Sequence, residues 1–86
     1  MAEVKQFVMF DYIIFLMDDK KIFSNKLNEL MKQANISSLA LSKIIGVRDT
    51  TVLRWRNGDR LPTVDKLRNL CQYFDVSADY LLGLED

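Results

Sequence analysis

The chain has 86 residues, of which 49% are hydrophobic and 28% charged, with 12 basic and 12 acidic side chains. This length and mixture describe one globular domain and exclude a disordered tail. Histidine is absent and Cys71 is the single cysteine, so an internal disulfide is excluded and the commonest general base and metal ligand is missing.

The neutral total conceals a segregation of charge along the chain. Residues 1–22 hold three basic against four acidic side chains, a net charge of −1. Residues 23–62 hold seven against three, a net +4, and residues 63–86 hold two against five, a net −3. Because attraction to phosphate depends on the local patch, a chain with this basic centre can bind nucleic acid despite its neutral total.

Residues 1–22 form an apolar extension in front of the rest of the chain. The run Phe7–Met17 is interrupted only by Asp11; it is too short for a membrane span of about 20 residues and does not fit a signal peptide. Its β-branched and aromatic residues favour a strand with two apolar faces, and a helix packed on the domain is the open alternative. Such a strand needs cover on both faces, so we expect a dimerisation element. Met17 offers an alternative natural start.

Two helices are predicted in the next part of the chain. Apolar residues recur at spacings of three and four from Phe23, and this stripe ends before Asn35, a residue that tolerates the left-handed conformation. Its members are Phe23, Leu27, Leu30, Met31 and Ala34. Ser37 is a predicted N-cap for a second, shorter helix, which Gly46 ends through a positive φ. Its expected inward residues are Leu41, Ile44 and Ile45.

Three more helices complete the predicted set. The third points Val52 and Trp55 inward and stops at Asn57-Gly58; this register favours core packing of the indole over a stacking platform for bases. Pro62 and Thr63 open the fourth. Its apolar stripe is Val64, Leu67, Leu70, Cys71 and Phe74. Ser77 caps a fifth turn ending at Gly83. The residues expected to close the core there, or alternatively to form a dimer contact, are Tyr80, Leu81 and Leu82.

The segment from Ser37 to Asn57 carries the most informative arrangement. Two short helices meet at Gly46-Val47, and so brief a joint makes them cross steeply, as in a helix-turn-helix. With the apolar residues of the second helix turned inward, its start and outer face are left to Arg48, Asp49, Thr50, Leu53 and Arg54. Guanidinium, carboxylate, hydroxyl and methyl groups together are what reading base edges in a major groove requires.

Residues Phe23 to Leu84 resemble the phage-repressor and Cro-like helix-turn-helix family, the XRE family. The resemblance rests on the order and spacing of several motifs: Leu27-Leu30-Met31, Ile36-Ser37, Leu41, Ile45-Gly46-Val47, Val52, Arg54-Trp55, Asn57-Gly58, Leu61-Pro62 and Val76 through Gly83. It implies an all-α, five-helix, lambda-repressor-like DNA-binding domain over residues 23–84, with an acidic tail at residues 85–86.

The resemblance also assigns roles to single residues. It implies that the helix from about Asp49 to Arg56 is a recognition helix in the major groove and that Ser38 contacts a phosphate. The residues it places against bases are Arg48, Asp49, Thr50 and Arg54. Further candidates for phosphate contacts are Lys43, Asn57 and Arg60. Asp49 keeps a second interpretation, as the N-cap of the recognition helix.

The chain departs from the family's pattern at one pair of positions. The family often has Glu after the tryptophan-like position and Arg near the end of the first helix, and these form an ion pair. Here the two positions hold Arg56 and Met31. Both partners are replaced together, so Arg56 is expected to be free to contact phosphate. The family's common Gln at the start of the second helix is Ser38 here, which makes that contact shorter.

Two functions are consistent with these features. The first is sequence-specific binding of double-stranded DNA by a homodimeric transcriptional regulator, a repressor, in the cytoplasm and associated with the nucleoid. The second is an antitoxin-like or other partner-binding protein, which holds another protein through Phe7–Met17 while it autoregulates its operon. Neither involves a cofactor, a metal or a membrane. An enzyme is not expected, because the sequence has no metal-ligand cluster, glycine-rich phosphate loop or activated nucleophile.

Overall fold

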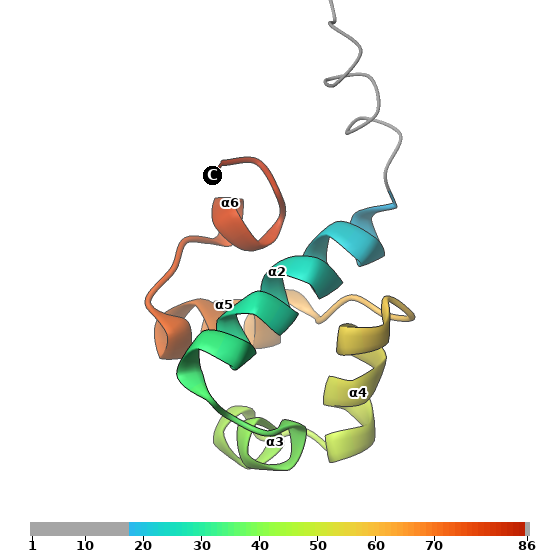
Figure 1. Ribbon diagram of the computed structural model, residues 1–86, viewed down its shortest axis with the longest axis vertical. Coiled ribbons are helices and arrows are strands. Elements are labelled where there is room, and N and C mark those ends of the chain that lie inside the picture. Colours follow the sequence, from blue (N-terminus) through green and yellow to red (C-terminus); the bar gives the residue numbers. More distant parts are fainter. Residues whose placement is uncertain (1–17, 86) are drawn as a thin grey trace, which may run out of the picture.

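The computed structural model describes residues 18–85, and within them the chain forms five α-helices and no β-strand (Figure 1). The helices are α2 (Asp19–Ala34), α3 (Ser38–Ile45), α4 (Asp49–Asn57), α5 (Val64–Phe74) and α6 (Ala78–Leu81). The predicted all-helical, five-helix fold is confirmed. The segment Phe7–Met17, predicted to be a strand or a helix that mediates dimerisation, lies outside the described residues.

The first described helix begins earlier than the apolar stripe suggested. Asp18 has an extended backbone and its carboxylate accepts a hydrogen bond from the backbone N–H of Lys20 at 3.0 Å, so α2 starts at Asp19, four residues before Phe23. An acidic cap is favoured at this end because it satisfies a free N–H and faces the positive end of the helix dipole. At the other end Asn35 adopts the predicted left-handed conformation, with φ 54°.

The predicted caps of the short helices are confirmed. The hydroxyl of Ser37 accepts from the N–H of Ala40 at 3.1 Å, and that of Ser77 accepts from the N–H of Tyr80 at 3.0 Å. Each bond satisfies one of the free N–H groups at the start of a helix. Gly46 ends α3 with φ 87°, so the turn between α3 and α4 forms at the residue predicted from the sequence.

One hydrophobic core joins all five helices. Trp55 lies in it at 1% exposure and packs edge-on against the ring of Phe23, with 6.5 Å between the ring centres. The buried apolar residues are Phe23, Leu27, Leu30, Met31, Leu41, Ile45, Val52, Trp55, Leu70 and Leu81. Cys71 packs against this cluster, and burial raises the pKa of its thiol. The expectation that Trp55 is a core residue is therefore confirmed.

Four residues of the predicted apolar stripes and core lie on the surface instead. Ala34 is exposed because it is the last residue of α2. Ile44 is 51% exposed because the narrow buried stripe of α3 is made by Leu41 and Ile45. Val64 is 83% exposed because it is the first residue of α5, beyond the edge of the core. Leu82 is 41% exposed because α6 ends at Leu81 and the next residue caps the helix. In each case the apolar stripe predicted from the sequence continues beyond the part of the helix that is buried.

The helices are arranged around α2. Figure 1 shows α2 crossing the molecule, with α6 toward one side and α3 and α4 toward the other. α4 packs against both α3 and α2, and α5 packs against α3 and α6. In the same view α3 is seen nearly end-on while α4 runs upright, which is the steep crossing predicted for a helix-turn-helix. Nowhere in residues 18–85 is there a helix long and apolar enough to cross a membrane.

Candidate nucleic-acid interface

Helix α4 has one anchored face and one open face. Val52 and Trp55 are 0% and 1% exposed and attach the helix to the core. On the other side the residues predicted to contact bases are all exposed: Arg48, Asp49, Thr50 and Arg54. Leu53 lies among them at 43% exposure. The core thus holds α4 rigidly while leaving its polar side chains and one apolar side chain available to a ligand.

The start of α4 removes one of the two interpretations of Asp49. The N-cap is Arg48, with φ −77° and ψ 152°, and no side chain makes a capping hydrogen bond there. Asp49 is the first helical residue instead, so the hypothesis that it caps the helix is wrong. Its carboxylate lies in the first turn, where the helix dipole favours a negative charge. The start of α5 is likewise without a capping hydrogen bond from the side chain of its N-cap residue, Thr63.

The residues predicted to contact phosphates lie on the elements that flank this face. Lys43 is exposed in the last turn of α3, and Asn57 is exposed at the end of α4. Arg60 is exposed in the turn after α4, which begins at Gly58 with φ 78°. Ser38 is the first residue of α3 and is half-buried. These positions give donors on both sides of α4, as a helix lying in a groove between two phosphate backbones needs.

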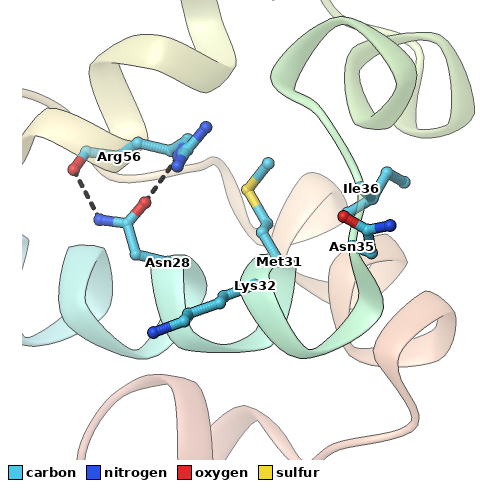
Figure 2. Close-up of a pocket in the computed structure, with 6 residues that line it drawn as sticks. All are labelled: Asn28, Met31, Lys32, Asn35, Ile36 and Arg56. Atoms are coloured by element: carbon cyan, nitrogen blue, oxygen red, sulfur yellow. Dashed lines mark hydrogen bonds between the residues drawn. The ribbon is translucent and has the colours of Figure 1, made fainter.

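Arg56 differs from its expected state, because its guanidinium is not free. Its Nε donates to Oδ1 of Asn28 at 2.6 Å, and Nη1 donates to Oγ of Ser38 at 2.8 Å. Figure 2 shows Asn28 also donating to the backbone oxygen of Arg56, a bond of 3.0 Å. The expectation of a free side chain was wrong: losing the Glu–Arg pair did not release Arg56, since Asn28 and Ser38 offer neutral partners within reach.

Two residues of α2 in this network were not predicted from the sequence. Asn28 bonds Arg56 as described, and Ser24 donates from its hydroxyl to the backbone oxygen of Arg56 at 2.5 Å. Ser24 is buried and Asn28 half-buried. The signal that could have revealed them is their spacing: two small polar residues four apart follow directly after Phe23 and Leu27 of the apolar stripe, and so lie together along its edge. We call Ser24, Asn28, Ser38 and Arg56 the Arg56 network.

The cations of the candidate interface are not neutralised by nearby carboxylates. Across residues 18–85 the one ion pair is Lys66–Asp65, at 4.0 Å on α5. That carboxylate also accepts from the hydroxyl of Thr63, and this hydrogen bond lowers the pKa of Asp65. The same part of the chain contains no group of three side chains suited to hold a metal ion. The basic charge around α3 and α4 is therefore available to an anionic ligand.

Known regulators share this sequence pattern. The sequence profile of the helix-turn-helix family matches residues 27–81. YobD, an HTH-type transcriptional regulator of Bacillus subtilis (strain 168), is 31% identical over 65 residues, which are 76% of this chain and 58% of YobD. AnsR, an HTH-type transcriptional regulator of the same organism, is 33% identical over 61 residues, which are 71% of this chain and 53% of AnsR. The chain thus spans little more than half the length of these two relatives.

Solved structures agree with the sequence comparison. A LexA protein from Eubacterium rectale, described as an SOS-response transcriptional repressor, superposes with a TM-score of 0.74 at 31% identity, covering 81% of this chain and 72% of that one. A transcriptional regulator from Listeria innocua superposes with a TM-score of 0.70 at 28% identity, covering 74% and 60%. The relatives are described as transcriptional regulators. The chain belongs to the helix-turn-helix family of DNA-binding transcriptional regulators.

Proposed function

We propose that this chain binds a specific double-stranded DNA sequence by placing α4 in the major groove. The observation that carries the proposal is the pair of faces on α4: an apolar side anchored in the core and an open side that holds Arg48, Asp49, Thr50 and Arg54. An α-helix fits the width of the major groove. Arg54 suits the O6 and N7 acceptors of guanine, Thr50 suits a thymine methyl, and Asp49 suits the N4 donor of cytosine.

Phosphate contacts on either side would hold α4 in register. We assign them to Lys43 on α3, to Asn57 at the end of α4 and Arg60 in the turn after it, and to Ser38 at the start of α3 together with Arg56 of α4, which is hydrogen-bonded to it. Such contacts carry no sequence information, but they supply much of the affinity and make it depend on salt. The cluster of cations without carboxylate partners supports this role.

We further propose that the chain acts as a homodimer and represses transcription. In this proposal residues 23–84, together with the first turn of α2, are the DNA-binding domain, and residues 1–22 contain the dimerisation element Phe7–Met17. A two-fold dimer reads two half-sites about one helical turn apart. The LexA relative is described as a repressor, whereas BcrR of Enterococcus faecalis, 28% identical over 64 residues, is described as an activator. A reporter gene fused to the regulated promoter, assayed with and without the protein, shows whether the protein represses or activates transcription.

Selection of bound sequences from random duplex DNA is the experiment that tests this function. Enrichment of one motif, with an inverted repeat for a dimer, is the expected result. Arg54→Ala should then lose about 1–3 kcal/mol of binding free energy and relax the preference at one base pair. The matched control is Arg68→Ala, which removes another exposed arginine, on α5, and should keep the motif. No enrichment, or binding that does not weaken with added salt, would refute the proposal.

A further inference from the structure

We propose that a hollow between α4 and the start of α5 binds a small organic anion with an apolar body, of which an aryl carboxylate is the simplest kind. We call it the α4–α5 hollow; it shares no residue with the Arg56 network. Its volume is about 500 Å³, which lies within the usual range for sites of small ligands. Figure 1 shows the turn that borders it, which leaves the end of α4 and runs across the molecule to α5.

The α4–α5 hollow has an apolar part that comes from two elements. Val47 and Trp55 contribute to it from the start and the end of α4, and they lie on the same side because they are two helical turns apart. Leu61 and Pro62 contribute from the turn. Leu61 is 37% exposed, so an apolar body in the hollow would remove apolar surface from water and gain free energy by doing so.

The charged part of the same lining is entirely positive. Arg60 lies in the turn and Lys66 in the first turn of α5, and no acidic side chain is among the described residues that line the hollow. Lys66 lies 4.0 Å from the carboxylate of Asp65, at the outer limit of an ion pair. The ammonium group has three N–H donors, so at least two remain for a ligand. The two cations therefore attract an anion into the hollow.

The lining also contains uncharged donors. Thr51 and Thr63 each contribute a hydroxyl group. The indole N–H of Trp55 is the one buried side-chain polar group of residues 18–85 without a hydrogen-bond partner. The hollow thus has a wall residue with a donor that the fold itself leaves unused. A few polar groups on a mainly apolar wall are the usual composition of a site for a small ligand.

Simpler classes of ligand match this lining less well. An inorganic anion would satisfy the cations and leave the apolar side chains uncovered. A neutral apolar molecule would cover those side chains but leave Arg60 and Lys66 without an acceptor, and a cation would be repelled. A molecule with a carboxylate at one end and an apolar body at the other uses both parts of the lining.

Occupation of the α4–α5 hollow should also weaken the binding of DNA. This step rests on the proposed function, which assigns Arg60 to a phosphate of the duplex. The same guanidinium would pair with the anion in the hollow, so its charge would be partly neutralised. The coupling must be reciprocal: the duplex should lower the affinity for the small anion by the same factor. The hollow is in this way a site for an effector that releases DNA.

The position of Trp55 allows a direct test with 3-phenylpropionate. Trp55 is the one tryptophan of the chain and lines the hollow, so titration at constant ionic strength should change its fluorescence saturably and shift the amide resonances of Thr51, Thr63 and Lys66. 3-Phenylpropionamide keeps the apolar body without the charge, and acetate keeps the charge without the body. Each should bind about tenfold more weakly. The absence of a saturable change in both signals, or equal binding of the amide or of acetate, overturns the site.

Variants separate a specific site from general attraction by charge. Arg60→Gln and Lys66→Gln should each weaken the binding of 3-phenylpropionate about tenfold, since each removes one charged donor. The matched control is Arg68→Gln, which removes an exposed cation from the same helix as Lys66 but outside the hollow and should bind like the wild type. Thermal unfolding should show that all three variants fold. Equal losses in Lys66→Gln and Arg68→Gln would overturn the site.

A titration of the selected duplex tests the coupling to DNA. Saturating 3-phenylpropionate should lower the affinity of the wild-type chain for the duplex, whereas acetate at the same concentration and ionic strength should not. A saturable fluorescence change with unaltered affinity for DNA supports the site and overturns its role as an effector site. If the wild-type chain binds no duplex at all, the proposed function fails, and the fluorescence titration alone judges the site.

Discussion

Trp55 fixes α4 to the rest of the molecule. It is the largest buried side chain, at 1% exposure, and it lies against Phe23 of α2. Its indole N–H is the one buried side-chain polar group in residues 18–85 without a hydrogen-bond partner. The residue therefore contributes through its volume and its apolar contacts, while its nitrogen carries an uncompensated desolvation cost.

Because the ring of Trp55 stabilises the core and its N–H does not, two substitutions of this residue should have different effects. Trp55→Ala should lower the free energy of unfolding by about 3–5 kcal/mol, because it leaves a large cavity under α4. Trp55→Phe should cost clearly less, since it keeps a ring in the core and removes the unpartnered N–H. Urea unfolding measures both, with Leu53→Ala on the open face of α4 as the control, expected near zero. Equal losses for Phe and Ala would contradict this account of the indole.

At the scale of the element, the start of α4 gives up stability for an exposed cation. Ser37 and Ser77 cap α3 and α6 with side-chain hydrogen bonds, whereas Arg48 occupies the same position before α4 and makes none. The backbone of Arg48 is already extended as in a capped helix. A capping residue would fit there without a change of fold, so the helix itself does not require arginine at this position.

Arg48→Ser should therefore separate stability from binding. The serine hydroxyl is expected to cap α4 and raise the free energy of unfolding by about 1 kcal/mol, while the loss of the arginine weakens binding to the selected duplex. Ser37→Ala is the reciprocal control and should lose about the same amount from α3. Chemical unfolding and duplex titration measure the two effects separately. An Arg48→Ser variant that is less stable, or that binds DNA as tightly as the wild type, would refute this interpretation.

Gly46 and Gly83, two of the three glycines with positive φ, should differ in their tolerance of a side chain. Both have positive φ, 87° and 78°, so alanine at either position costs about 1–2 kcal/mol in backbone strain. A Cβ at Gly46 would meet nothing within 4 Å, whereas one at Gly83 would collide with Cγ2 of Ile22. Gly83→Ala should therefore destabilise the fold more than Gly46→Ala in thermal unfolding. Adding Ile22→Ala should recover part of the difference; no recovery would show that the contact is not its cause.

The elements show which features a sequence can reveal and which it cannot. Ser37, Gly46 and Trp55 were predictable because a cap, a positive φ and an apolar register depend on a few neighbouring residues. The Arg56 network was not, because Arg56 reaches partners 28 and 18 positions away, and those contacts exist only once three helices have crossed. The early start of α2 at Asp19 was missed because its first turn carries charged residues ahead of the apolar stripe.

For the whole molecule, the distribution of charge matters more than its total. Of the net +4 of residues 23–62, +3 falls on α3, α4 and their turns and +1 on α2, whereas the net −3 of residues 63–86 falls on α5, α6 and the end of the chain. Such a dipolar molecule is attracted to DNA by one side and repelled by the other, which orients it before contact. A single copy nevertheless offers few phosphate contacts, and a dimer doubles them.

Removal of residues 1–16, which starts the chain at Met17, tests whether the apolar extension provides that second copy. It keeps Asp18 and all of α2, so the domain should fold and each copy should still recognise one half-site. Light scattering should show a dimer for the full chain and a monomer for the shortened one. Affinity for the two-fold site should fall, and the slope of log affinity against log salt should be halved, because half of the phosphate contacts are lost. If the shortened chain remains a dimer, the dimer contact lies outside residues 1–16. If the full chain is monomeric at the same concentration, the proposal of a homodimer is refuted.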